Sequence, residues 1–189
     1  MNVMIWIFIA ILIYYVYRIT QVLIRLDQSV ILPATVEELE SIRKVPQKTV
    51  KPPTYSGQKT GILFNILLLL YITGMLILIW QVQFADSFML YFLILLLPVL
   101  RLSDFLNLFA VTEAGVLCGA RFASWKSIRS YTFVPIDINH RYYGHSKEVN
   151  DKHELRIKTR LGTLSCIITN EELKAKLEKL LNAKEEYGQ

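Results

Sequence analysis

Three long runs of apolar residues dominate the first half of the chain. They extend over Val3 to Tyr17, Gly61 to Trp80 and Phe88 to Leu100. The second run has 20 residues without a charge, and a helix of that length at about 1.5 Å per residue matches a hydrocarbon layer of about 30 Å. The pattern therefore predicts three transmembrane helices, of which the first continues to residue 26 and the third bends near Pro98.

The positions of Lys and Arg predict an orientation for these helices. Residues 18–59 carry seven Lys and Arg, and residues 81–87 carry none. Since positive residues accumulate in short cytosolic loops, we expect a multi-pass protein of the cell membrane with its N-terminus outside and its C-terminal domain in the cytosol. The net charge of +5 agrees with this topology. Arg18 and Arg25 are expected to reach lipid headgroups, so membrane lipids are expected partners.

After the third run, apolar and polar residues alternate with the period of β-strands. Strands are expected at residues 110–117, 121–125, 129–136, 154–160 and 163–169. Glu113-Ala114-Gly115 interrupts the first of them as a bulge or a turn, and Leu161-Gly162 suits a hairpin loop. The pattern is typical of antiparallel strands joined by hairpins.

A helix is expected to follow the last strand. Thr169 to Glu172 fits a capping box, and Leu173, Leu177, Leu180 and Leu181 form one apolar stripe at helical spacing. We expect this stripe to be buried against the strands. A second capping box, Thr35 to Glu38, predicts a short amphipathic helix in the first loop.

Together these elements predict an α+β membrane protein with three transmembrane helices and a small antiparallel sheet closed by a C-terminal helix. The expected segments are a first transmembrane helix at residues 1–26, a cytosolic loop with a short amphipathic helix at 27–60, a transmembrane hairpin at 61–110 and a cytosolic domain at 111–189.

Two short motifs carry a resemblance to a known family. Val111-Thr112-Glu113-Ala114-Gly115-Val116 follows a predicted span, and Trp125-Lys126-Ser127-Ile128 leads into the next strand. With the closing helix, residues 108–181 resemble bacterial pleckstrin-homology-like (PH-like) domains attached to transmembrane hairpins. The resemblance implies a PH-like module for binding or assembly without catalytic machinery. The additional N-terminal span departs from the family pattern, and phosphoinositide binding is not implied.

The polar segment at residues 137–153 is long for a connection between two strands, and such loops often bind partners. It contains the candidate partner-binding residues Arg141, Tyr142, Tyr143 and Lys147. The next strand adds a row of cations about 7 Å apart on one face, formed by Arg156, Lys158 and Arg160. Such a row engages phosphates or is the solvated face of a sheet, and we favour the solvated face.

Three polar residues fall within the apolar runs or at their ends: Asn65, Arg101 and Asp104. Ionisable residues at such positions are candidates for functional sites. Arg101 and Asp104 lie three residues apart, however, and near the membrane surface such a pair stabilises a helical hairpin. We favour this structural interpretation.

The sequence predicts no metal, cofactor or catalytic residue. His140, His145 and His153 are spaced by five and eight residues in an expected loop, which provides no fixed zinc geometry. Cys118 and Cys166 are expected to be reduced and to pack as small apolar side chains. Nucleic-acid motifs are absent from the sequence.

The leading hypothesis is a non-enzymatic integral membrane protein whose cytosolic PH-like domain binds or organises a membrane or cytosolic protein. An oligomer is compatible with this function. The alternative is a membrane protein that provides immunity against a bacteriocin or toxin or protects the envelope, and neighbouring genes would separate the two. An enzyme acting on lipid precursors, with Arg101 or His140 in its site, is a third and less favoured hypothesis.

Overall fold

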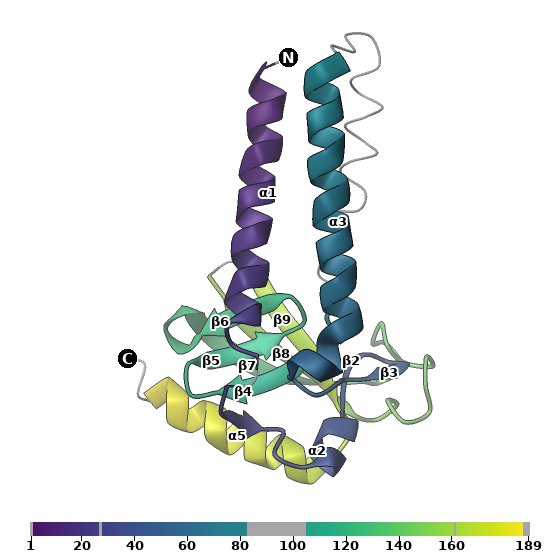
Figure 1. Ribbon diagram of the computed structural model, residues 1–189. Helices are drawn as coiled ribbons and strands as arrows, with labels where there is room; N and C mark the ends of the chain where they lie inside the picture. The colour runs from purple at the N-terminus through teal and green to yellow at the C-terminus, as the bar shows by residue number, and fades with distance from the viewer. Residues whose placement is uncertain (1, 27, 83–104, 161, 187–189) are drawn as a thin grey trace.

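The computed structural model describes residues 2–26, 28–82, 105–160 and 162–186 (Figure 1). The helices are α1 (Asn2–Leu23), α2 (Val36–Glu40), α3 (Tyr55–Val82), the 3-10 helix η2 (Trp125–Ser127) and α5 (Glu171–Glu186). The strands are β1 (Val30–Leu32), β2 (Ile42–Val45), β3 (Lys48–Thr49), β4 (Phe109–Thr112), β5 (Gly115–Cys118), β6 (Arg121–Ser124), β7 (Ile128–Pro135), β8 (His153–Thr159) and β9 (Gly162–Ile168).

The strands form two antiparallel sheets, with the order β1-β4-β5-β6 in one and β3-β2-β9-β8-β7 in the other. The strands predicted from alternation in the second half of the chain are present. Of the two alternatives predicted at residues 113–115, the turn is correct, because residues 110–117 form the hairpin of β4 and β5. The turn falls at Glu113-Ala114 and is followed by Gly115. The φ of Gly115 is 154°, a conformation that only glycine adopts readily.

The two sheets enclose the main hydrophobic core, and α5 covers its open side. The four-stranded sheet contributes Phe109, Val111, Val116 and Ala123, the five-stranded sheet contributes Leu155, Ile157, Leu164, Cys166 and Ile168, and α5 contributes Leu173, Leu177 and Leu181. The predicted C-terminal helix and its apolar stripe are therefore confirmed. Its N-terminus differs from the prediction, since the Asn170 side chain accepts hydrogen bonds from the backbone of Glu172 and Leu173.

A second core lies on the other face of the four-stranded sheet, beneath α1 and α3, which project side by side from the sheets (Figure 1). Tyr15, Ile19, Val22 and Leu26 pack there with Leu106, Leu108, Ala110, Leu117 and Ala120. β4 and β5 are therefore buried on both faces, which explains why these strands are almost continuously apolar.

The predicted transmembrane architecture is wrong. Among the residues that the structure describes, no helix combines the length and apolar character needed to cross a membrane. This finding overturns the three transmembrane helices, the multi-pass location in the cell membrane and the orientation with an outside N-terminus and a cytosolic domain. Part of the apolar sequence of α1 and α3 is used instead for packing against the four-stranded sheet. The third apolar run, at residues 88–100, falls outside the described residues.

Residues 30–49 contribute strands to both sheets, whereas the sequence predicted only a short helix there. β1 pairs with β4, and β2 pairs with β9. The predicted capping box is confirmed, because Thr35 Oγ1 accepts from the Glu38 backbone at 3.3 Å and Glu38 Oε2 accepts from the Ala34 backbone at 2.7 Å. Ile42 lies beyond the end of α2 and is buried in β2. The segment thus connects the two sheets.

The hairpin of β4 and β5 provides a test of the fold. A Cβ atom at Gly115 would collide with the backbone oxygen of Ala123, and its φ is unfavourable for other residues. Gly115→Ala is expected to lower the free energy of unfolding by about 1–3 kcal/mol, measured by urea unfolding. As a control, a Cβ at Gly74 in α3 meets no described atom within 4 Å, so Gly74→Ala should be neutral or slightly stabilising. Equal stability of both variants would contradict the hairpin geometry.

Candidate functional site

The segment between β7 and β8 is folded over the outer face of the five-stranded sheet. Its ends are joined by two backbone hydrogen bonds, from Ile136 to Lys152 at 2.7 Å and from Asp151 to Ile136 at 3.1 Å. A small apolar cluster holds it down, formed by Ile136, Val149 and Ile167 with Tyr142 packed against them. The predicted polar loop is therefore an ordered structure with its own core.

This loop covers Glu154, whose side chain is fully buried (0% exposed). The carboxylate accepts hydrogen bonds from Arg141 Nη2 at 2.8 Å and from Arg156 Nε at 2.6 Å, and it lies 3.1 Å from His140 Nε2. Burial tends to raise the pKa of Glu154, but the hydrogen bonds from Arg156, Arg141 and His140 outweigh burial and hold the pKa below its ordinary value. Glu154 is thus an ionised anchor for two guanidinium groups.

The two arginines remain accessible although they are anchored. Arg141 exposes 60% of its side chain and Arg156 exposes 37%. One carboxylate facing two guanidiniums leaves an excess of positive charge at the surface. We call this surface the loop platform and define it by His140, Arg141, Tyr143, Glu154 and Arg156. Chemically, it presents fixed guanidinium groups, which suit the carboxylates or phosphates of a ligand.

The other predicted partner-binding residues have different environments. Tyr142 is partly buried, and the guanidinium of Arg141 lies 4.5 Å from the centre of its ring, so Tyr142 supports the platform from below. Tyr143 and Lys147 are exposed. Lys158 and Arg160 are also exposed and extend the row of cations along β8 beyond Arg156. The structure therefore brings Arg141 and Arg156 together and leaves the remaining residues spread along the same strand and loop.

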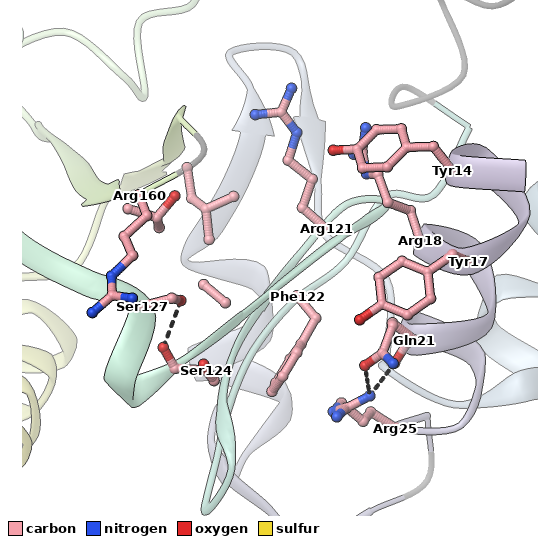
Figure 2. Close-up of a pocket in the computed structure, with 13 residues that line it drawn as sticks. Tyr14, Tyr17, Arg18, Gln21, Arg25, Arg121, Phe122, Ser124, Ser127 and Arg160 are labelled. Carbon is pink, nitrogen blue, oxygen red and sulfur yellow. Dashed lines mark hydrogen bonds between the residues drawn. The ribbon is translucent and has the colours of Figure 1, made fainter. Parts of the chain in front are cut away.

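The row ends at a second site, a cavity of about 710 Å³ between α1 and the strands (Figure 2). We call it the arginine groove. Its lining includes four arginines, Arg18, Arg25, Arg121 and Arg160, and the aromatic residues Tyr14, Tyr17 and Phe122, together with Gln21, Ala123, Ser124, Ser127, Thr159 and Leu164. Among the described residues, none of the lining side chains is acidic. The groove is therefore strongly cationic.

Neighbouring groups hold two of these arginines in place. Arg25 Nη1 donates to the backbone oxygen of Gln21 at 2.8 Å and to its Oε1 at 2.5 Å, and its guanidinium lies 3.9 Å from the centre of the Phe122 ring. Arg18 Nη2 donates to the Ala120 carbonyl at 3.2 Å. Burial and the positive charge of Arg121 lower the pKa of Arg18. The groove thus places like charges near each other.

Sequence reasoning missed this groove because its residues come from distant segments of the chain. Arg18 and Arg25 were assigned to headgroup contact, and Arg121 was considered only as the start of a strand. One signal was present, because Tyr14, Arg18, Gln21 and Arg25 are spaced three or four residues apart and share one helix face. That face lines the groove in Figure 2.

The polar residues predicted within the apolar runs do not form a site in the described chain. Asn65 is buried in α3, where its Oδ1 accepts a hydrogen bond from the Tyr15 hydroxyl and its Nδ2 donates to the Gly61 carbonyl at 2.7 Å. These bonds connect α1 to α3 and give Asn65 a structural role. Arg101 and Asp104 lie outside the described residues.

The cysteines lie in the main hydrophobic core, whereas the histidines lie between β7 and β8 and at the start of β8. Within residues 2–26, 28–82, 105–160 and 162–186, no group of three or more His, Cys, Asp or Glu side chains is placed to hold a metal ion. Cys118 and Cys166 are buried and free of disulfides. Burial raises the pKa of both thiols, which disfavours the reactive thiolate.

No protein-family model, curated protein or solved structure matches this chain. The resemblance of residues 108–181 to PH-like domains therefore stays a prediction.

Proposed function

We propose that this protein is a non-enzymatic binding protein whose loop platform engages an acidic segment of a partner protein. The observation that carries the proposal is the anchoring of two accessible guanidiniums by the buried carboxylate of Glu154. Side chains that are already ordered lose less conformational entropy when a ligand binds. The planar guanidinium also matches a carboxylate with two parallel hydrogen bonds.

Exposed apolar side chains in the same loop support a protein partner. Ile138 is 77% exposed, and Tyr143 is exposed as well. Tyr and Arg are enriched among the residues that contribute most to the binding energy of protein interfaces. The same loop therefore offers both charged and apolar contacts to a partner. The order of strands followed by α5 supports the idea of a PH-like module for such binding.

The contacts of the His140 ring with neighbouring side chains support a role without catalysis. Its Nε2 contacts both Glu154 at 3.1 Å and Arg156 Nη2 at 3.2 Å. His140 Nδ1 also accepts a hydrogen bond from the Tyr142 backbone at 3.2 Å, so both ring nitrogens are engaged in positioning the platform. An enzyme that used His140 as an acid or base would need one of them for its substrate.

The test is cross-linking and affinity purification of the full chain, followed by direct binding of the purified partner. The variant combines Arg141→Ala, Tyr143→Ala and Lys147→Ala, and it retains Tyr142 because that ring packs in the loop core. We expect the Kd for the partner to rise at least about tenfold, which corresponds to about 1.4 kcal/mol. Binding by the unmodified protein should weaken with added salt, which screens charges.

The matched control removes two cations elsewhere, with Lys126→Ala in η2 and Lys179→Ala in α5, both exposed. It should bind as the unmodified protein does. Equal binding by the loop variant and this control would overturn the proposal. If Lys158→Ala removes binding while the loop variant retains it, the partner occupies the open face of β8 instead.

A further inference from the structure

The arginine groove is a second site, separate from the loop platform and independent of its proposed function. We propose that the groove binds a phosphate group carried on a larger molecule, with Arg18 and Arg121 as the principal ligands of the phosphate. Arg18 lies on α1, and Arg121 begins β6. Both side chains line the cavity, Arg18 beside Tyr14 and Arg121 across from it (Figure 2).

The charge of the groove is the first argument for an anion. In the loop platform, the fold supplies a buried carboxylate for its two guanidiniums. In the groove, by contrast, none of the four lining arginines forms an ion pair with a carboxylate among the described residues. Arg18 and Arg25 are partly buried, whereas Arg121 and Arg160 are exposed. Like charges that lie near each other repel, and a bound anion would relieve that repulsion.

The placement of Arg121 is the second argument. A Cβ atom at Gly162 would lie 3.5 Å from Arg121 Nη1, so this guanidinium lies near the turn between β8 and β9. Arg18 reaches across from α1, and its Nη2 donates a hydrogen bond to the carbonyl of Ala120, the residue before Arg121. A guanidinium has five donor hydrogens, so most donors of Arg18 stay available. Two guanidiniums that approach from different elements suit the several oxygens of a phosphate.

The size of the groove and the residues at its margin indicate what kind of molecule carries the phosphate. A volume of about 710 Å³ falls in the range of pockets for whole small molecules and exceeds the need of a single ion. Tyr14 and Tyr17 form one margin and are about half exposed, and the adjoining Ile13 on α1 is also exposed. The ligand is therefore a phosphate ester with an apolar or aromatic body, from either a lipid headgroup or a soluble phosphorylated compound.

Binding assays with the full chain test this site. The probes are inorganic phosphate, a soluble short-chain phosphatidic acid, and phosphatidylcholine vesicles with and without phosphatidic acid, measured by calorimetry and co-sedimentation. We expect at least one phosphate probe to bind. Arg18→Gln together with Arg121→Gln should raise its Kd at least about tenfold, because two charge-assisted contacts are lost. Arg129→Gln, an exposed position on β7 outside the groove, should leave the Kd unchanged.

A stability measurement separates loss of the site from loss of the fold. Without ligand, Arg121→Gln should keep or raise the melting temperature, since one of the repelling charges is removed. With ligand, it should lose the stabilisation that binding confers on the unmodified protein. Binding of inorganic phosphate and of the lipid with similar affinity would identify the phosphate alone as the determinant. Binding of the lipid only would show that the apolar body contributes.

Two results would overturn the proposal: no binding of any phosphate probe, or binding that the double variant leaves unchanged. The loop variant with Arg141→Ala retains the groove and should bind phosphate normally. Failure of the loop platform to bind a protein and failure of the groove to bind phosphate are therefore separate outcomes.

Discussion

A Leu177→Asp variant is expected to have a much lower free energy of unfolding. Truncation of a buried Leu costs about 2–5 kcal/mol, and the loss in this variant should be at least as large. Leu177 is fully buried (0% exposed) in the middle of α5, between Leu173 and Leu181. A carboxylate at this position has no polar partner in the apolar core, which adds a desolvation cost to the lost packing. Urea unfolding and limited proteolysis should both show the loss, with α5 becoming accessible to protease.

The control for this variant must avoid Lys176. That residue precedes Leu177, but its Nζ lies 2.7 Å from Glu38 Oε1 on α2, so Lys176→Asp would place two carboxylates together. Lys179 is exposed on the same helix, and Lys179→Ala should change stability by less than about 0.5 kcal/mol. Similar protease resistance of Leu177→Asp and Lys179→Ala would show that α5 is not docked on the sheets.

A Glu154→Gln variant is expected to have a free energy of unfolding that is about 2–4 kcal/mol lower at neutral pH. Removing one partner from a buried ion pair costs about 3–5 kcal/mol, and the value is reduced here because Arg141 and Arg156 are partly exposed to solvent. The loss should depend on pH. In the folded protein the pKa of Glu154 lies below its ordinary value of 4.5, so its stabilising effect is complete above that value and is lost as the pH falls through the folded pKa.

Urea unfolding between about pH 7 and pH 3 would measure this pattern. The difference between the unmodified protein and Glu154→Gln should shrink in acid. The pKa of Glu38 is also lowered, mainly by its hydrogen bond to Lys176, but Glu38 is present in both proteins and its effect cancels. Glu148→Gln is the control, since Glu148 pairs with Arg43 yet exposes 66% of its side chain. A difference for Glu154→Gln that stays constant with pH would contradict the proposed role of its carboxylate.

Local patterns predicted the strands and helices of the C-terminal half well. β7, β8, β9 and α5 each contain enough residues for a period of two or 3.6 to be recognisable. β1 and β3 have three and two residues, which is too short for any period. Their positions depend on pairing with distant strands, and that information is not local.

The apolar runs were misinterpreted because hydropathy counts apolar residues without regard to their neighbours. Ile19 and Val22 of α1 are buried against β4 and β5, which lie about 90 residues further along the chain. Glu154 was missed for a related reason. Alternation placed it on the outer, solvated face of β8, and only the folding of the loop over that face removes it from water.

The pairing of β2 with β9 has a consequence for the order in which the protein assembles. It places Ile42 opposite Ile168, so almost the whole chain must be available before the five-stranded sheet is complete. Closing such a long loop costs entropy before any contact compensates for it, and chains rich in distant pairings fold slowly. During synthesis, β2 therefore cannot form its pairing with β9 until β9 has left the ribosome. Although β2 is synthesised early, its pairing with β9 is among the last native contacts to form.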